Sequence, residues 1–309
     1  MYTTPGELRS PALAGDSCLI CGSARLIPHF RRASRAAVGK PEHARQEPYR
    51  ITRSQRRLVG NVVRCRECGM VMLPQALSTP ADYGNGADPY YVRQGPQRIA
   101  NAHRLLDLVP AGGRLLDVGC ACGFLLVAAR ARGFAVEGVE VSAWASGHAR
   151  REHGLDVKTG TVETLGLPAE TYDVVVMSDT IEHLTSPRQT VQTVRRILRQ
   201  GGRLLVLTPD IGSLAARLAG ARWWGLLDDH YFYFSRATLR RFLEGEGFTI
   251  ERLVALGRQF PVPHWVSKLS QYSGAPHQAV ERLTRVLHLD QVQISINLGD
   301  QMACVARKM

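Results

Sequence analysis

The stretch RLLDVGCACGFLL, Arg114–Leu126, carries an apolar run into a turn that contains two glycines. A second apolar run, VEGVEVS, ends at Ser142, and its acid Glu140 lies 23 residues after Asp117. A strand, a glycine-containing turn, a helix and a second strand that ends in an acid form the βαβ unit that binds nucleosides. In such a unit the backbone of the turn approaches the ligand, and the acid accepts hydrogen bonds from the ribose hydroxyls.

The glycines of this turn also limit which nucleoside fits. A dinucleotide fingerprint reads G-x-G-x-x-G, whereas the glycines here are Gly119 and Gly123 only. No Lys-Ser or Lys-Thr pair follows them, so the residues that bind a triphosphate are missing as well. The turn therefore argues against a dinucleotide ligand.

Apolar runs and helical patterns alternate along most of the chain, which predicts a doubly wound α/β fold with a mostly parallel sheet covered on both faces. The predicted strands are Arg114–Val118, Ala135–Glu140, Leu155–Thr159, Tyr172–Ser178, Arg203–Pro209, Phe248–Leu253 and Gln301–Arg307. The predicted helices are about Ile99–Leu108, Phe124–Arg132, Ser142–His153, Arg188–Arg199 and Arg236–Glu246. Ser78–Pro96 is rich in Pro, Gly and Asp, which indicates a linker. Residues 258–300 form an insertion that we expect to cap the substrate side, with a helical pattern at Val280–Leu289.

Four of the seven cysteines form two C-x-x-C-G motifs. Each motif offers two thiolates from one tight turn, and two such motifs complete a tetrahedral four-sulfur site for Zn²⁺. Disulfides and a redox pair are the alternatives, and a reducing cytosol disfavours disulfides. We predict a closed, structural zinc site whose ligands are Cys18, Cys21, Cys65 and Cys68.

The formal net charge of +12 is uneven along the chain. Residues 1–68 hold thirteen Lys or Arg and five Asp or Glu, a balance of +8, which one zinc ion on four thiolates would lower to +6. This charge fits either a solvated Arg-rich surface or a partner that carries phosphate or carboxylate. Nucleic acid is one such partner, but aromatic residues that would stack on bases are sparse in this region.

No apolar run approaches the ~20 residues that span a bilayer, and the N-terminus lacks a basic start followed by an apolar block. The sequence therefore predicts a cytoplasmic protein without a membrane partner. Its length and its 45% apolar content suffice for one α/β core and a smaller module. We expect a zinc ribbon with a basic insertion over residues 1–80, and a larger domain over residues 81–309 that begins with a linker and a lead-in helix at 81–113.

In their order and spacing, the motifs from Arg114 to Val206 resemble those of class I S-adenosylmethionine-dependent methyltransferases. DVGCACG is similar to the first motif of that family, GVEVS to the ribose-binding second motif, and GTVETL to the turn beside the adenine. YDVVVMSDTIEHL and LRQGGRLLVLTP resemble the fourth-strand motif and the fifth strand with its preceding loop. With its double cysteine motif and WWGLLDDHYFYFS, the chain resembles a bacterial subgroup that joins a zinc ribbon to this fold and often methylates sugars or secondary metabolites. The resemblance implies a seven-stranded sheet whose last strand is antiparallel.

The resemblance also implies where S-adenosylmethionine binds. Glu140 would bind the ribose hydroxyls, and residues 161–163 would border the adenine. The residues implied at the cofactor are Asp117, Gly119, Cys120, Gly123, Glu140, Val141, Val162, Ser178 and Asp179. The chain departs from the family at Ala121, where a glycine is usual, and at Thr161, where many relatives have an acid.

Two histidines compete for the role of proton acceptor. His230 lies in DDHYFYFS, which resembles an E-H-x-x-Y-F-S segment of sugar C-methyltransferases whose histidine acts as base; the alternative is a histidine that only packs in an aromatic lid. His183 follows the fourth strand, at the edge where such folds bind ligands. With Asp179 and Glu182, the two histidines also resemble the set that binds Mg²⁺ in relatives that methylate oxygen.

We therefore predict a methyltransferase that acts on a hydroxyl or acidic carbon of a small anionic metabolite, such as a nucleotide sugar or a natural-product intermediate, with His230 as base. One alternative is an RNA methyltransferase that docks through its zinc module, although no N-P-P-Y-type motif for amino-group methylation follows the fourth strand. A second alternative is a Mg²⁺-assisted O-methyltransferase. A third is a binding module that keeps the fold without catalysis.

Overall fold

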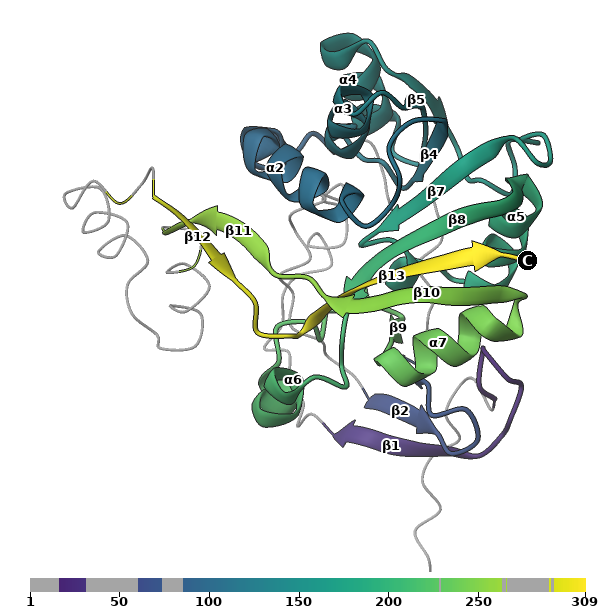
Figure 1. Cartoon of the computed structure of the whole chain (residues 1–309). Coiled ribbons are helices and arrows are strands. Elements are labelled where there is room, and N and C mark those ends of the chain that lie inside the picture. Colours follow the sequence, from purple (N-terminus) through teal and green to yellow (C-terminus); the bar gives the residue numbers. More distant parts are fainter. Residues whose placement is uncertain are drawn as a thin grey trace, which may run out of the picture.

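A seven-stranded sheet in the order β10-β13-β8-β7-β4-β5-β6 organises the chain (Figure 1). This computed structural model describes residues 17–31, 61–73, 86–227, 229–262, 265, 289 and 292–309. The strands are β4 Arg114–Val118, β5 Ala135–Glu140, β6 Asp156–Thr159, β7 Tyr172–Ser178, β8 Leu198–Pro209, β10 Phe248–Ala255 and β13 Gln301–Lys308. β13 runs antiparallel to both of its neighbours, β8 and β10, and every other pair in this sheet is parallel, which confirms the predicted fold class and the antiparallel last strand.

Helices cover both faces of the sheet because alternate side chains of each buried strand point to opposite sides. Val174 and Val176 of β7 pack in one core, and Val175 and Met177 pack in the other. The first core is closed by α2 Gly95–Leu106, α3 Phe124–Ala131 and α4 Ala143–His153. The second core is closed by α5 Pro187–Ile197 and α7 Arg236–Gly245. Shorter helices lie in the connections after β7 and β8: η4 Ile181–His183, α6 Leu214–Ala219 and η5 Gly220–Arg222.

Local capping signals predict the bounds of α4 correctly, whereas the predicted end of α5 is wrong. α4 starts after Ser142, whose hydroxyl accepts a hydrogen bond inside the first turn, and it ends at Gly154 with a φ of +58°. α5 was expected to reach Arg199 but ends at Ile197. Leu198 is already extended and fully buried as the first residue of β8, so pairing within the sheet overrides the helical pattern.

Part of the expected linker is helical. α1 Pro89–Arg93 starts after Asp88, whose side chain accepts a hydrogen bond from the Tyr91 backbone N–H at 2.9 Å. Tyr91 is buried and stacks on Phe124 of α3, with ring centroids 5.7 Å apart. The Asp-Pro pair that reads as a loop signal therefore caps a helix, because proline is well tolerated at the first helical positions. The earlier part of the expected linker lies outside the described residues.

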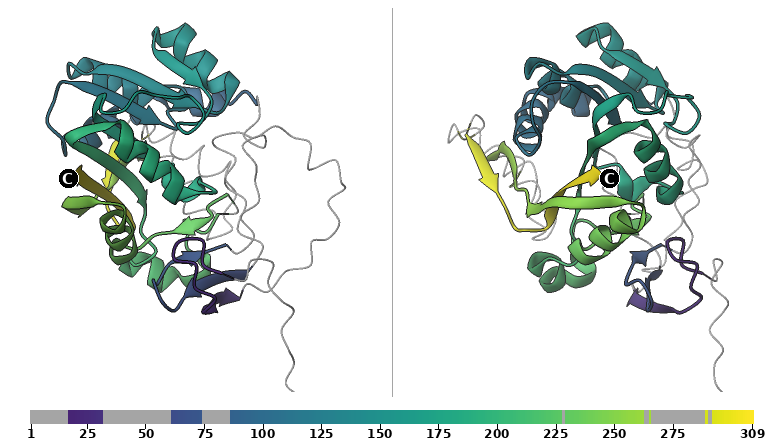
Figure 2. Two further views of the ribbon diagram at one scale, coloured as in Figure 1. Left: turned by 90° about the vertical axis from the view of Figure 1, so that its right-hand side faces the viewer. Right: turned by 45° about the vertical axis from the view of Figure 1, so that its right-hand side comes forward.

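We call residues 17–31 and 61–73, which carry the two C-x-x-C-G motifs, the cysteine module. A second sheet holds this module together. It contains β1 Leu26–Arg31, β2 Asn61–Cys65, β3 Val71–Met72 and β9 Phe232–Tyr233, all paired antiparallel. β9 comes from the carboxyl-terminal half of the chain, so this sheet joins two segments that are distant in sequence. Both views of Figure 2 place the module at one end of the molecule, on the side of α7. The basic insertion was expected between Cys21 and Cys65; β1 and most of β2 occupy its ends, and residues 32–60 lie outside the part of the chain that the structure describes.

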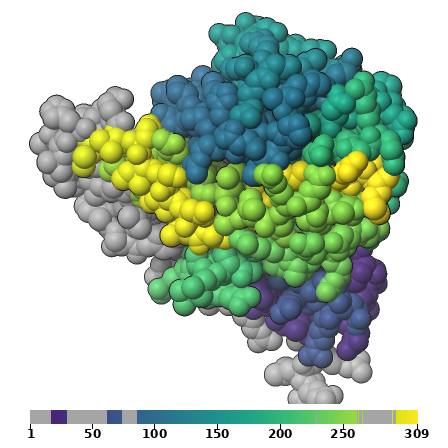
Figure 3. Space-filling model, in the orientation of Figure 1, coloured from purple at the N-terminus to yellow at the C-terminus, as the bar shows by residue number. Residues whose placement is uncertain are grey.

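The described ends of the expected cap form a small sheet of β11 Arg258–Pro261 and β12 Gln293–Ile296. This sheet lies against α2, as Figure 3 shows. Asn101 of α2 fixes it by bonding both the N–H and the carbonyl of Gln259, each at 2.8 Å. The helical pattern expected at Val280–Leu289 falls almost wholly outside the described residues. Among the helices that the structure describes, none is both long and apolar enough to cross a membrane.

Gly138→Ala should destabilise the fold, because the new β-carbon would lie 2.7 Å from Cys120 Sγ and 2.8 Å from the Leu126 side chain. We expect the free energy of unfolding to fall by about 1–3 kcal/mol, the range for overpacked cores. Gly245→Ala is the matched control, because its β-carbon would meet open space at the end of α7. That variant should be neutral or up to about 1 kcal/mol more stable. Urea unfolding compares the two, and equal losses would contradict the packing argument.

Candidate functional site

The turn between β4 and α3 follows an unusual backbone path. Gly119, Ala121 and Gly123 have φ angles of +78°, +48° and +81°. A β-carbon at Gly119 would lie 2.8 Å from Thr180 Oγ1, so this position has room for glycine only. The left-handed conformation of Ala121 costs about 1–2 kcal/mol of free energy. Its N–H donates to Glu140 Oε2 at 2.8 Å, and this bond to a buried carboxylate offsets the strain.

Two buried carboxyl groups flank this turn at the carboxyl ends of β4 and β5. Glu140 accepts from the Ala121 N–H and, at 2.7 Å, from the Ser142 N–H. Asp117 Oδ1, in contrast, has no hydrogen-bond partner among the described residues. Burial, with a smaller contribution from the Glu140 charge, raises the pKa of Asp117 to about 8. A buried carboxyl oxygen without a partner is costly, so this atom suits a ligand that brings a donor such as an ammonium or hydroxyl group.

The lead-in helices add two residues that the sequence did not single out. The Arg98 guanidinium lies 3.8 Å above the Tyr91 ring and donates to Gln94 Oε1 at 2.8 Å. Its buried Nε has no partner within the described part of the chain. Burial raises the pKa of Tyr91, on which the charges of Arg98, Glu140 and Asp117 also act. Tyr91 packs against Ala121 and Cys122 of the turn, and Arg98 stacks on Tyr91, so both residues lie beside the turn that the carboxyl pair flanks.

The loop after β7 supplies the next group. Asp179 adopts a φ of +51°, and both its oxygens accept from Arg258 Nη2 at 2.6 Å. Gln301 Nε2 donates to the same carboxylate at 2.9 Å. Arg258 begins β11 and Gln301 begins β13, so the cap and the last strand hold this loop. Asp179 is thus occupied by a guanidinium and lies outside the metal-ligand group in which the sequence placed it.

His183 and His230 face each other, with ring centroids 4.6 Å apart. His183 Nδ1 lies 2.8 Å from the Asp229 carbonyl, and His230 Nδ1 lies 2.9 Å from the Gly225 carbonyl. Because a carbonyl can only accept, each Nδ1 carries the hydrogen, and a neutral His230 ring keeps its lone pair on Nε2. Burial and the His183 charge hold the pKa of His230 well below its ordinary value. His230 is therefore neutral at pH 7 and can accept a proton or bind a cation.

Glu182 completes this group. Its Oε2 accepts from Thr208 Oγ1 at 2.9 Å, while its Oε1 is buried with no hydrogen-bond partner among the residues that the structure describes. Burial raises the pKa of Glu182 to about 7. One ligand atom each from Glu182, His183 and His230 lies within 4.8 Å of the others. We name these three residues the histidine site.

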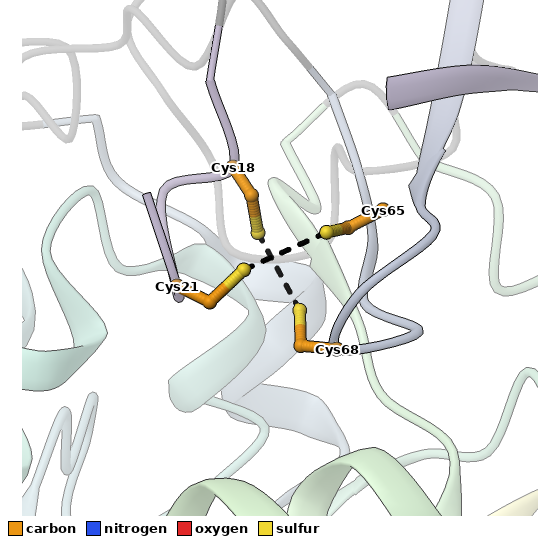
Figure 4. A group of neighbouring side chains, drawn as sticks. All are labelled: Cys18, Cys21, Cys65 and Cys68. Carbon is orange, nitrogen blue, oxygen red and sulfur yellow. Dashed lines mark hydrogen bonds between the residues drawn. The ribbon is translucent and has the colours of Figure 1, made fainter. Parts of the chain in front are cut away.

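The four cysteines of the two C-x-x-C-G motifs converge at one point (Figure 4). Sγ of Cys18 lies 3.5 Å from that of Cys68, and Sγ of Cys21 lies 3.6 Å from that of Cys65. A Zn–S bond of about 2.3 Å implies sulfur atoms about 3.8 Å apart in a tetrahedron, so the set fits a zinc ion. The glycine after each motif has a positive φ, +75° at Gly22 and +77° at Gly69, which lets each turn close.

The residues predicted at the cofactor fall into three places. Those at the ends of β4 and β5 lie together: Asp117, Gly119, Cys120, Gly123, Glu140 and Val141. Ser178 and Asp179 lie at the end of β7, which neighbours β4. Val162 follows β6 at the far edge, and its side chain is buried in the core. The carboxyl ends of three neighbouring strands thus form one edge, where doubly wound folds bind their ligands.

Comparison with known proteins gives a family for this arrangement. A methyltransferase-domain family matches residues 91–253. A protein of Mycolicibacterium smegmatis named as an S-adenosylmethionine-dependent methyltransferase is 33% identical over 188 residues, which cover 58% of this chain and 68% of that protein. A ubiquinone biosynthesis O-methyltransferase of Caulobacter vibrioides is 33% identical over 149 residues, 44% of this chain and 59% of that enzyme. The chain thus spans 59% and 68% of the length of these two relatives.

A solved structure agrees with the fold. An S-adenosylmethionine-dependent methyltransferase of Thermotoga maritima matches with a TM-score of 0.50 and 20% identity, over 71% of this chain and 95% of that one. The family match over residues 91–253 includes the glycine turn, both carboxyl groups and the histidine site. The chain therefore belongs to the methyltransferase-domain family, in which its relatives include S-adenosylmethionine-dependent methyltransferases.

Proposed function

We propose that the protein transfers a methyl group from S-adenosylmethionine to a hydroxyl or acidic carbon of a small anionic metabolite, and that His230 is the base. The observation that carries this proposal is the buried imidazole of His230, whose Nδ1 lies 2.9 Å from the Gly225 carbonyl and whose ring faces His183, just after the end of β7. Bound S-adenosylmethionine supplies an electrophilic methyl group on a sulfonium. What remains for the protein is to align the acceptor and remove its proton.

Three polar groups around the turn support cofactor binding. Asp117 offers an unpartnered buried oxygen to an ammonium group. Glu140 keeps further lone pairs for ribose hydroxyls after accepting two backbone bonds, because an ionised carboxylate has about four acceptor sites. Arg98 offers its guanidinium to a carboxylate. An amino acid joined to a nucleoside carries an ammonium group, ribose hydroxyls and a carboxylate, which are the three ligand groups that these side chains can bind.

The lowered pKa of His230 is compatible with the role of base. A proton moves from the acceptor hydroxyl to Nε2, and the imidazole becomes cationic. The same step removes the positive charge of the sulfonium, so the net charge of the site stays constant. Burial therefore disfavours a cationic His230 in the empty site more than it does during the reaction.

A second candidate, metal-assisted O-methylation, is favoured by the spacing of the histidine site. Its three ligand atoms lie within 4.8 Å of one another, and Glu182 Oε1 has no hydrogen-bond partner in the described structure. Asp179 is engaged by Arg258, so three protein ligands would remain. Two imidazoles and one carboxylate suit a transition-metal ion better than Mg²⁺, which prefers oxygen ligands.

His230→Asn tests the base. The asparagine amide can still donate to the Gly225 carbonyl but lacks a counterpart of Nε2, so turnover should fall about 10²–10⁴-fold while cofactor affinity holds. The assay supplies labelled S-adenosylmethionine with nucleotide sugars and with RNA, and calorimetry measures the affinity. His103→Asn on α2 is the matched control. Transfer to RNA alone, or full turnover in His230→Asn, would refute the proposal.

The metal content separates the two candidates. We expect one zinc ion per chain in the purified protein, held by the four cysteines and lost in Cys65→Ser. His230→Asn should retain that ion, because its ligands are the cysteines. We expect no second ion in either protein, because the histidine site is proposed to work without metal. Elemental analysis by mass spectrometry gives the stoichiometry. A second equivalent that disappears in His230→Asn would favour the metal-assisted reaction.

Asp117→Asn should change how stability depends on pH. The folded-state pKa of about 8 exceeds the ordinary value of 3.8, so the folded protein binds more protons than the unfolded chain between about pH 4 and 8. Stability from this group is therefore present at low pH and lost as pH rises. The unfolding free energy of the wild type relative to Asp117→Asn should fall by up to about 1.4 kcal/mol per pH unit in that window. Urea unfolding at pH 5, 6 and 7 measures this, and parallel curves would contradict it.

A further inference from the structure

The cysteine module and the histidine site are joined by backbone pairing. Strand β3 of the module pairs with β9, with Val71 opposite Tyr233 and Met72 opposite Phe232. The pairing continues one residue further, because the Leu73 N–H donates to the Tyr231 carbonyl at 2.9 Å. β9 begins two residues after His230, so the edge of the module directly adjoins the proposed base.

The metal-ligand end of the module belongs to the same hairpin as β3. Cys65 closes β2, and Cys68 lies in the turn that leads to β3. Within the turn, the Cys65 N–H donates to the Met70 carbonyl at 2.9 Å and the Gly69 N–H donates to the Cys65 carbonyl at 3.0 Å. Any change in how the two cysteines are held therefore reaches β3 within a few residues.

The path continues from β9 to the other half of the histidine site. The Tyr231 N–H donates to the Glu182 carbonyl at 2.8 Å. Tyr231 is thus bonded to the module through its carbonyl and to η4 through its N–H. Because η4 carries Glu182 and His183, one residue links all three members of the site to the module.

The contact between the cysteine module and the segment around β9 is buried from solvent. Met72 and Phe232 are fully buried, and Cys65 packs in the same core as Leu239 of α7. Two side chains add polar anchors: Arg188 donates to the Ile20 carbonyl and Arg241 to the Cys68 carbonyl, each at 2.8 Å. Figures 1 and 2 show the module beside α7, away from β4 and β5.

We propose that the cysteine module is a positioning element for the histidine site, and that a zinc ion on its four cysteines fixes the β3–β9 pairing on which the site geometry depends. This inference rests on the proposed function for the catalytic meaning of that geometry. A strand of two residues has no stability of its own and needs its partner strand. Bonds from the four cysteines to the ion would hold the Cys65–Cys68 turn against Cys18 and Cys21, so loss of the ion should loosen the hairpin, then β9 and η4. Among the described residues, no backbone hydrogen bond joins β4 or β5 to the module, so the cofactor edge should persist.

Hydrogen exchange of the full chain, zinc-loaded and after treatment with a zinc chelator, tests this coupling. Chelation should raise exchange about 10-fold or more in residues 181–183 and 231–234, because the pairing that protects them is lost. Residues 114–118 and 135–140 should stay protected, and the affinity for S-adenosylhomocysteine by calorimetry should change less than about two-fold. The ring ¹⁵N signals of His230 should lose the pattern of a single tautomer with hydrogen on Nδ1.

A pair of variants separates the backbone link from the metal itself. Leu73→Pro removes the N–H that bonds Tyr231 but keeps the four cysteines, and Leu73→Ala keeps the N–H while it shortens the side chain. Leu73→Pro should hold zinc and still show the exchange and tautomer changes, whereas Leu73→Ala should resemble the wild type.

Unchanged exchange and His230 signals after chelation would overturn the inference, and so would equal loss of protection at the cofactor edge, which would mean global unfolding. These readouts do not depend on methyl transfer. If His230→Asn proved fully active, the proposed function would fail while the coupling could still be observed.

Discussion

The pair of backbone hydrogen bonds to Glu140 is the constraint on which the cofactor edge depends. One bond holds Ala121 in the middle of the glycine turn, and the other holds Ser142 at the start of α4. A single carboxylate thereby ties the ends of β4 and β5 and lets a non-glycine residue keep a positive φ. Its negative charge also disfavours ionisation of Asp117, which leaves a buried carboxyl group ready for a cationic donor.

Much of this edge follows from the sequence because its interactions are local. The bounds of β4, β5 and β7 agree with the predicted strands. For β7 the reason is that a parallel strand buried on both faces reads as a nearly continuous apolar segment. Ser142 and Gly154 also delimit α4 through contacts within one helical turn. Four cysteines in two tight motifs converge because each motif fixes two of them in one turn.

The remaining parts of the site could not be predicted from the sequence, because they depend on residues that are distant from one another in the chain. Arg258 engages Asp179 across the sheet edge, and no spacing rule connects a residue after β10 with one after β7. Tyr91 lies in a segment whose Asp-Pro pair indicates a loop but here starts a helix, and Arg98 gains its place by stacking on Tyr91. β9 is too short to show a strand period, and its partner β3 precedes it by most of the chain.

The two halves of the site are therefore held by different means. The cofactor half is fixed by one βαβ unit and its own hydrogen bonds, so it tolerates change elsewhere. The histidine half combines η4, the loop before β9 and an edge strand of the cysteine module, all outside that unit. The two halves also meet directly, because Thr180, just before η4, donates through Oγ1 to the Val118 carbonyl of β4 at 3.0 Å. Loops and modules of this kind can vary while the scaffold is kept. In the proposed arrangement, the burial of the module against β9 gives a loop histidine the rigidity that β4 and β5 would give a bound cofactor.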